Sequence, residues 1–371
     1  MKRSYGLLSI PAMIAAATLA PSAAHAAVFT IDCGSGGATT ALQTQINSIG
    51  SNPGDQINVL GTCNGSVVVS NADRLTISGL SLTGVLSTTN SKSVRFTNLS
   101  VNGSLQLVNS RNSSLVNVKM LGDTIITRGS QVTFSTLDAA PWSDADGTHD
   151  STFNCVGQSE CSLFAATLTG SNTSNTSVGL NIGSEARLNL YAGSISGYGI
   201  GVQAWNNSVA FIQSQCDPIT ISGNRVTGVY AEDGGTVKVY GTSAADAALY
   251  ECPSSAAVLV DITSNGKYGV LADGGGNAYL HFTRMTGHTL DGVRVQHGSV
   301  VRVRSSQIGA GTSSGRAARV KALSHLYFDE QEAGPAAGST LSGPVCVTTS
   351  SYADAENSST ALTIVRSCPG P

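Results

Sequence analysis

The chain has 371 residues, of which 12% are charged, and its formal net charge is −3 at pH 7. This charge balance does not indicate electrostatic capture of nucleic acid or of a membrane surface, so we expect neither as a partner. No Pro-rich linker or change of composition divides the chain, which favours one elongated domain.

The chain begins with the pattern of a secretory signal. Lys2 and Arg3 precede an apolar stretch from Leu7 to Ala20, and residues 24–26 (AHA) form an A-x-A cleavage site. A membrane anchor is the alternative, but the stretch is shorter than the roughly 20 residues that span a bilayer. We therefore expect residues 1–26 to be removed, no transmembrane segment to remain, and the protein to be extracellular or periplasmic.

A short helix and a turn come next. Residues 39–49 (TTALQTQINSI) have the apolar spacing of an amphipathic helix, and residues 52–55 (NPGD) have the composition of a turn. We assign residues 27–60 to an N-terminal cap and first strand. The helix can cover the first of any coils that follow.

Residues 61–330 contain an internal repeat. Two apolar columns recur with a constant step, 99 − 80 = 19 in the first: Leu80, Leu99, Val118 and Leu137, and Ile77, Phe96, Leu115 and Phe134. Short alternating runs such as 237–240 (VKVY) and 301–304 (VRVR) lie between Gly, Asn and Ser, and no amphipathic helical segment occurs within a repeat. This pattern predicts an all-β solenoid, a parallel β-helix in which each coil buries its apolar side chains against its neighbours.

The second half keeps this design with a longer step. Three apolar residues are 23 apart: Ile262, Met285 and Ile308. The still longer separation of Ile221 from Ile262 indicates an insertion, which we place at 242–257, and the regular step is also interrupted at 138–162. Residues 331–371 are left as a C-terminal cap and tail.

Asparagines stand where tight corners are expected. They are Asn98, Asn117, Asn224 and Asn265. Because Asn adopts the left-handed backbone conformation more readily than most residues, we expect all four to do so.

The first coils resemble the pectin-lyase-like family of right-handed parallel β-helix proteins. That family begins with a short helix, a PGD turn, a strand that ends in a Gly-Thr pair, and the first rungs. The matching segments here are 53–55 (PGD), 57–60 (INVL), 61–62 (GT) and 75–79 (LTISG). The resemblance covers the architecture from Ile31 to Tyr327 and implies a right-handed β-helix.

Enzymes of this family act on acidic polysaccharides, with sites built from outward side chains of stacked strands and from long loops. The hydrolase signatures Asn-Thr-Asp, Asp-Asp, Gly-His-Gly and Arg-Ile-Lys do not occur in this sequence, and neither does the Arg-x-Pro-x-x-Arg of pectate lyases. The resemblance therefore predicts a fold and leaves the reaction open.

Eight cysteines remain after the signal, with no C-x-x-C pair that would indicate zinc. An even number in a secreted chain favours disulfides. Four pairs are expected: Cys33 with Cys63 at the N-terminal cap, Cys155 with Cys161 across a small loop, Cys216 with Cys252 at one corner of successive coils, and the remaining Cys346 with Cys368 at the C-terminal cap. Eight cysteines allow about 105 pairings, so other connectivities stay open at this point.

Outward side chains of stacked strands should lie about 4.8 Å apart. On one strand the expected columns are Trp205, Glu232, Asp273 and Gln296, with Gln203, Tyr230, Leu271 and Arg294 beside them. On the next strand they are Ala210, Lys238, Tyr279 and Arg302, and Ile212, Tyr240, His281 and Arg304.

These columns suggest chemistry on a uronic acid polymer. Elimination needs a cation at the sugar carboxylate and a base for the adjacent proton, and the candidates for these roles are Lys238, His281, Arg294 and Arg304. The substrate-binding candidates are Trp142, Trp205, Tyr230, Tyr240, Tyr279, Glu232 and Asp273. The carboxylates of Glu232 and Asp273 could also serve glycoside hydrolysis or bind calcium. A solvated sheet face is the alternative for the whole strip.

The interruption at 138–162 contains Trp142 and an acidic run. Asp144, Asp146 and Asp150 have part of the spacing of a calcium loop, although Gly147 and Thr148 do not continue the EF-hand pattern. A solvated acidic loop is the alternative. We expect no required cofactor, with calcium as the ion that this loop would take.

Two functions remain. The first is a secreted, monomeric β-helix protein that binds an acidic polysaccharide or cell-surface glycan, or cleaves it by lyase rather than hydrolase chemistry. The second is a noncatalytic adhesion or interaction module that uses the same rigid face.

Overall fold

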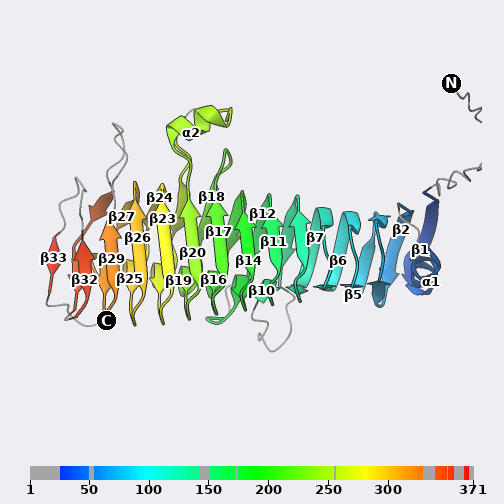
Figure 1. The fold of residues 1–371 in the computed structure, drawn as a ribbon, viewed down its shortest axis with the longest axis horizontal. Helices are drawn as coiled ribbons and strands as arrows, with labels where there is room; N and C mark the ends of the chain where they lie inside the picture. Colours follow the sequence, from blue (N-terminus) through cyan, green and yellow to red (C-terminus); the bar gives the residue numbers. More distant parts are fainter. Residues whose placement is uncertain are drawn as a thin grey trace, which may run out of the picture.

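Parallel β-strands stack on one another along the chain (Figure 1). The computed structural model describes residues 26–49, 54–141, 151–171, 174–254, 256–328, 339–348, 350–354 and 363–366. Each strand pairs with its equivalents one coil before and one coil after, as β19 (Thr227–Ala231) does with β16 (Ile200–Ala204) and β22 (Tyr268–Ala272). The predicted all-β solenoid with a short N-terminal helix is confirmed. Of the predicted signal, only Ala26 belongs to the described residues.

The first coils contain long strands that continue through corners. They are β1 (Val28–Ala38), β2 (Gln56–Asn64), β3 (Val67–Ser70), β4 (Thr76–Ser78), β5 (Ser81–Thr89), β6 (Arg95–Val108), β7 (Ser113–Thr127), β8 (Gln131–Phe134) and β9 (Leu137–Ala140). The shorter of the two predicted steps is confirmed here, since Phe96 pairs with Leu115 and Leu99 pairs with Val118. The side chains of both predicted columns are buried.

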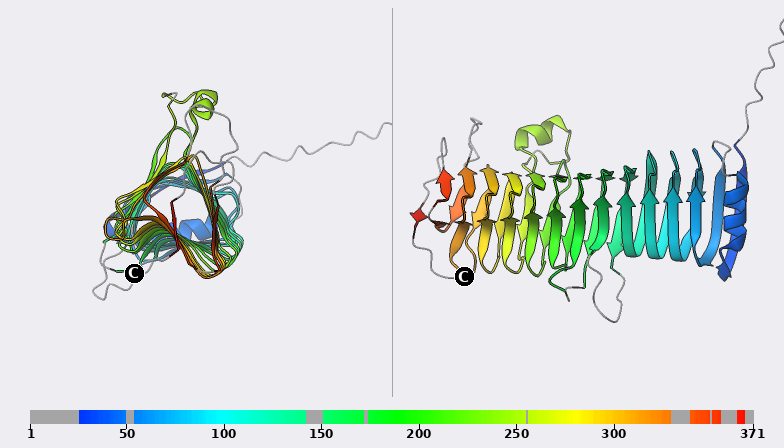
Figure 2. Two further views of the ribbon diagram at one scale, coloured as in Figure 1. Left: turned by 90° about the vertical axis from the view of Figure 1, so that its left-hand side faces the viewer. Right: turned by 60° about the horizontal axis from the view of Figure 1, so that its bottom comes forward.

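From residue 151 on, the coils are built from three strands each, so the solenoid has three faces (Figure 2). The first face contains β10 (Ser151–Val156), β13 (Val178–Gly183), β16, β19, β22, β25 (Asp291–Val295), β28 (Arg316–Val320), β31 (Val345–Val347) and β33 (Ile364–Val365). The second face contains β11 (Glu160–Leu163), β14 (Arg187–Leu190), β17 (Val209–Gln213), β20 (Thr236–Tyr240), β23 (Asn277–His281), β26 (Val300–Arg304), β29 (His325–Phe328) and β32 (Tyr352–Asp354). The third face contains β12 (Ala166–Thr169), β15 (Gly193–Ser196), β18 (Ile219–Ser222), β21 (Val260–Thr263), β24 (Thr283–Thr286), β27 (Gln307–Gly309) and β30 (Thr340–Ser342).

Apolar columns fill the space between the three faces. The longer steps of the second half are confirmed by a column of paired residues on the third face: Ile195, Ile221, Ile262, Met285 and Ile308. None of these side chains is more than 1% exposed. Burial of each contributes about 1.5 to 3 kcal/mol, and most of that burial is against the coils on either side.

One corner of the first coils accepts only glycine. Gly84, Gly103 and Gly122 stack there with φ between +136° and +147°. A Cβ on Gly103 would lie 2.0 Å from the carbonyl oxygen of Gly84, and one on Gly122 would lie 1.8 Å from that of Gly103. Both the backbone conformation and the space therefore exclude a side chain.

The N-terminal helix α1 (Thr40–Ile49) covers the first coil, as the sequence predicted (Figure 1). Its residues Leu42, Ile46 and Ile49 are buried. The Gln43 side chain pairs with the backbone of β3: its amide oxygen accepts from Val68 N at 2.7 Å, and its amide nitrogen donates to Val68 O at 2.8 Å. These contacts occupy backbone groups that could otherwise pair with another chain.

The four corner asparagines fall into two classes. Asn98 and Asn117 have φ of +52° and +57°, as predicted, and the Asn117 amide donates to Asn98 Oδ1 at 2.8 Å. The prediction for Asn224 and Asn265 is wrong. Their neighbours Gly223 and Ser264 have the positive φ instead, and both asparagines are buried.

The buried asparagines form an internal ladder of hydrogen bonds. Asn265 Oδ1 accepts from the Asn224 side chain at 2.9 Å and from its backbone nitrogen at 3.0 Å, and Asn224 Oδ1 accepts from Tyr198 N at 3.1 Å. In the next coil His288 packs against Gly269 at the same corner and is 1% exposed. Burial lowers the pKa of His288 to about 4, so the imidazole is neutral at pH 7.

Insertion of α2 (Ala244–Leu249) accounts for the longest step. This helix lies within the predicted insertion, 242–257, between β20 and β21, and it stands away from the solenoid (Figure 1). No sequence pattern predicted a helix there. The second predicted interruption, 138–162, contains regular strands at both of its ends. Its residues include β9, β10 and β11, which keep the coil register.

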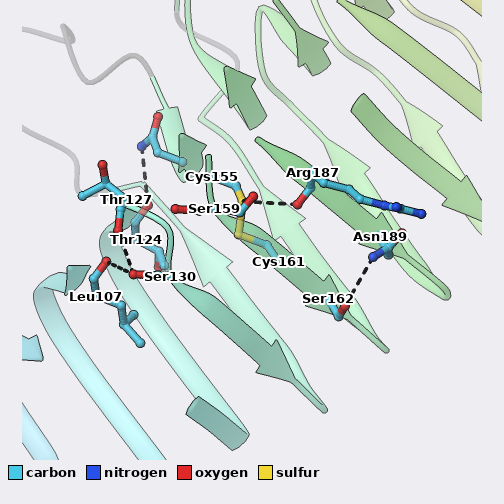
Figure 3. Close-up of a disulfide and its surroundings, with 11 residues drawn as sticks. Leu107, Thr124, Thr127, Ser130, Cys155, Ser159, Cys161, Ser162, Arg187 and Asn189 are labelled. Atoms are coloured by element: carbon cyan, nitrogen blue, oxygen red, sulfur yellow. Dashed lines mark hydrogen bonds between the residues drawn. A yellow bond between two sulfur atoms is a disulfide. The ribbon is translucent and has the colours of Figure 1, made fainter. Parts of the chain in front are cut away.

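Three predicted disulfides are confirmed: Cys33–Cys63, Cys155–Cys161 and Cys216–Cys252. Cys155 of β10 and Cys161 of β11 point inward and join two faces across a corner (Figure 3). Cys346 is also disulfide-bonded, whereas its predicted partner Cys368 lies outside the described residues. The disulfides indicate an oxidising compartment.

No helix in the described residues has the length and apolar character needed to cross a bilayer.

We predict that His288 makes stability depend on pH. Its pKa is about 4 in the folded protein and close to 6.5 in the unfolded chain, so between these values the unfolded state binds more protons. The free energy of unfolding should therefore fall as the pH is lowered from about 6.5 to about 4, by up to roughly 3 kcal/mol. Denaturant titrations at several pH values measure this loss.

The control is His288→Asn, which places in this coil the residue found at 224 and 265 in the two preceding coils. This variant should lose less stability on acidification than the wild type, because Asn does not titrate. Identical pH dependence in the two proteins would contradict the prediction.

Candidate functional site

On the second face, two predicted columns are displaced by one residue at their first member. Phe211, not Ala210, pairs with Lys238, so the predicted positions of Ala210 and Ile212 are wrong. Both of these side chains point inward and are fully buried. The remaining registers are as predicted: Lys238, Tyr279 and Arg302, and Tyr240, His281 and Arg304.

We call the outward surface of β14, β17, β20, β23 and β26 the basic face. Its side chains are Arg187, Asn189, Val209, Phe211, Gln213, Thr236, Lys238, Tyr240, Asn277, Tyr279, His281, Val300, Arg302 and Arg304. Four of them are Lys or Arg and none is Asp or Glu, although the chain has 23 acidic and 20 basic residues. This face therefore attracts anions.

Cations and aromatic rings alternate along the middle column of the basic face. Lys238 Nζ lies 4.9 Å from the ring centroid of Phe211 and 5.6 Å from that of Tyr279. The Arg302 guanidinium carbon lies 5.8 Å from the Tyr279 centroid and 5.6 Å from that of Tyr327 on β29. Each contact contributes about 0.5 to 1 kcal/mol at an exposed site. The cations are held over the ring faces, which leaves less ring surface for a stacked sugar.

Tyr240, His281 and Arg304 form the neighbouring column. The His281 ring meets Tyr240 edge-on at 6.2 Å between centroids and lies 4.4 Å from the ring of Phe282. Burial raises the pKa of Tyr240, and Tyr279 raises it further. A Tyr240 phenolate is therefore disfavoured as a base near neutral pH.

Glu232 is the centre of a separate polar cluster, at the corner where the first face ends. Tyr230 pairs with Gln203 in the strand before it, and the Gln203 amide donates to the Glu232 carboxylate. Burial raises the pKa of Tyr230 far above its usual value, and the hydrogen bond to Glu232 and the charge of Asp273 add to the effect. Tyr230 is therefore a neutral hydrogen-bond donor.

Asp273, one coil further, is held as a carboxylate. Gln296 Nε2 donates to Oδ2 at 2.8 Å, Gly274 N donates to Oδ1 at 2.8 Å, and His297 Nδ1 lies 2.5 Å from Oδ1. Burial alone would raise the pKa of Asp273, but these hydrogen bonds outweigh burial and lower it. The two corner carboxylates thus have different partners.

Trp205 and Arg294 are also held by their neighbours. The Trp205 indole packs on the backbone of Gly183 and donates to Asn181 Oδ1 at 2.8 Å. Arg294 Nε donates to the Gln296 side chain at 2.9 Å, and its guanidinium lies over the ring of Tyr268 at 4.9 Å. Arg294 belongs to the first face, so the structure does not bring it together with the three other catalytic candidates on the second face.

The predicted calcium loop and the tryptophan beside it stay predictions. Trp142, Asp144, Asp146 and Asp150 all lie outside the described residues. Within the described ranges, no group of three or more His, Cys, Asp and Glu side chains could hold a metal ion. Glu232 and Asp273 therefore do not form such a group with a third side chain of the described ranges.

Sequence reasoning missed Phe211 and Arg187. The Arg187 guanidinium carbon lies 4.5 Å from the Phe211 centroid, which extends the alternation of cations and rings by one strand. The sequence separation between Gln203 and Tyr230 could have identified Phe211, because the same separation joins Phe211 to Lys238.

The comparisons with known proteins found no match. No model of a known protein family matches the chain, and no curated protein or solved structure matches it.

We predict that Glu232→Gln lowers the pKa of Tyr230. The substitution removes the negative charge next to the phenol, whereas the burial that also raises the pKa remains. The Tyr230 ring resonance, followed by NMR during an alkaline titration, reports this change. Glu185→Gln is the control, because Glu185 lies at the same corner two coils earlier, where it accepts from Gln158 at 2.9 Å. An equal effect of both variants would argue against the Glu232 contact.

Proposed function

We propose that this is a secreted β-helix protein of the pectin-lyase-like type that binds an acidic polysaccharide along its basic face. The observation that carries the proposal is the absence of carboxylates from the outward positions of β14, β17, β20, β23 and β26, where four Lys and Arg side chains lie. The surrounding chain is slightly acidic. Lys238 and Arg302 stand in the middle column, whereas Arg187 and Arg304 stand in the columns on either side of it. The parallel sheet therefore spreads these cations along the solenoid, which suits a linear polyanion.

Cleavage by elimination would use groups of the same face. Lys238, Arg302 and Arg304 can neutralise sugar carboxylates, and His281 lies beside Arg304 in register. The raised pKa of Tyr240 disfavours this phenol as the base. His281 and Lys238 are therefore the base candidates for a lyase reaction.

The second candidate function is a noncatalytic adhesion or interaction module. The contacts of Lys238 and Arg302 with rings on either side support it, because such contacts fix the cations in place. A fixed array of charges suits binding without requiring proton transfer.

We predict that the mature protein binds polygalacturonate or alginate more tightly than a neutral glucan. The combined variant Lys238→Ala, Arg302→Ala and Arg304→Ala should bind at least tenfold more weakly, and added salt should weaken the wild type toward the variant. Calorimetry gives the affinities, and ultraviolet absorbance of unsaturated products reports elimination.

Arg284→Ala is the matched control, because Arg284 is an exposed cation on the third face, where its Nε donates to Asp261 at 2.8 Å. Its affinity should equal that of the wild type. Binding without unsaturated products supports the noncatalytic module. Equal binding of neutral and acidic polymers, or no effect of the triple variant, would refute the proposal.

We also predict that inward and outward positions of β20 differ in kind. Val239 is fully buried, so Val239→Ala should lower the free energy of unfolding by roughly 1 to 4 kcal/mol through the cavity it leaves. Lys238→Ala should change it less, by about 1 kcal/mol, because it removes two partly exposed cation contacts with rings and leaves no cavity. Denaturant unfolding measures both, and similar losses would refute the assigned inward and outward positions.

A further inference from the structure

A second group of cations lies toward the C-terminal end of the first face. Arg294 of β25 pairs with Arg319 of β28, so the two residues stand on adjacent strands, about 4.8 Å apart. Lys321 follows two residues after Arg319 and is partly exposed. None of these residues belongs to the basic face.

Arg319 is the unusual member of this group. It is only 7% exposed, and its Nε is buried without a hydrogen-bond partner among the described residues. A buried guanidinium is unfavourable unless hydrogen bonds and an opposite charge compensate for the water it has lost.

One oxygen of the nearby carboxylate, Asp291, is already engaged, and its other oxygen, Oδ2, is buried. Asp291 Oδ1 accepts from Arg316 Nε at 2.8 Å, in an ion pair whose side chains are 5% and 0% exposed. Asp291 therefore balances Arg316 and leaves Arg294, Arg319 and Lys321 with surplus positive charge within the described part of the chain.

The cations in this group act on one another. Burial lowers the pKa of Arg319, and the charges of Arg316 and Arg294 lower it further. The pKa of Lys321 is lowered by burial and by Arg294 and Arg319. An anion placed between them would relieve both the repulsion and the missing hydrogen bond.

We propose that Arg294, Arg319 and Lys321 form a binding site for a tetrahedral oxyanion, a phosphate or sulfate group. Arg319 offers its unpartnered Nε–H, and Arg294 retains guanidinium N–H donors beyond those that it gives to Gln296 and Tyr268. The ammonium of Lys321 adds a third charge. A group with two negative charges compensates three cations better than a single carboxylate does. This site does not depend on the function proposed for the basic face.

The test is thermal unfolding and calorimetry of the mature protein with inorganic phosphate, with sulfate, and with potassium chloride at the same ionic strength. Phosphate and sulfate should raise the melting temperature above the chloride control. Lys321→Gln should weaken their binding at least tenfold. Because Lys321 is partly exposed, this variant should keep the fold, whereas Arg319→Gln serves as a second variant at the buried position.

The pH dependence of binding distinguishes a site occupied by phosphate from one occupied by sulfate. Acidification should weaken phosphate binding, since phosphate loses its second charge, and should leave sulfate binding unchanged. Arg302→Gln is the matched control: it should retain phosphate binding even though it removes a cation of the basic face. Failure of both ions to exceed chloride, or equal stabilisation of the wild type and Lys321→Gln, would overturn the site without affecting the polysaccharide proposal.

Discussion

Parallel pairing between successive coils brings together residues that are far apart in the chain, such as Leu99 with Val118 and Ile221 with Ile262. Because the pairing is parallel and in register, one apolar side chain in each coil stands directly over its equivalent in the next coil. The inward columns, the glycine corner and the asparagine ladder all depend on this superposition. The same pairing places Lys238 between Phe211 and Tyr279 on the outside.

The sequence predicted the coils wherever a step repeats without change. A constant step aligns apolar residues that can only be buried against a neighbouring coil, so periodicity alone identifies the register. One of the three confirmed disulfides was predicted for the same reason, since aligned coils bring Cys216 close to Cys252. The helix α2 was not predicted, because an insertion at a corner is not constrained by the repeat.

Corner positions were harder to predict. Asn98 adopts the left-handed conformation itself, but at Asn224 the preceding Gly223 does so. Gly has no Cβ and adopts that conformation at lower cost, so the adjacent Asn is free to turn inward and bond to Asn265. A sequence shows that one of two neighbours makes the turn and does not show which.

The composition of the candidate sites depends on the face as well as on the column. Arg294 was grouped with Lys238 as a catalytic candidate although the two were expected on different strands of the coil, and the corner between the first and second faces separates them. Charge clusters such as Arg294 with Arg319 come from residues of successive coils, and their burial follows from side-chain packing that periodicity does not describe.

The spacing of the strands gives the basic face a unit of length. Lys238 and Arg302 are two coils apart, which is about 9.6 Å along the solenoid. Point mutations can change which charges occur on the basic face, but only the gain or loss of whole coils can change the length of this face. Tandem duplication of coils is therefore the evolutionary step that would lengthen this surface, in increments that the backbone itself dictates.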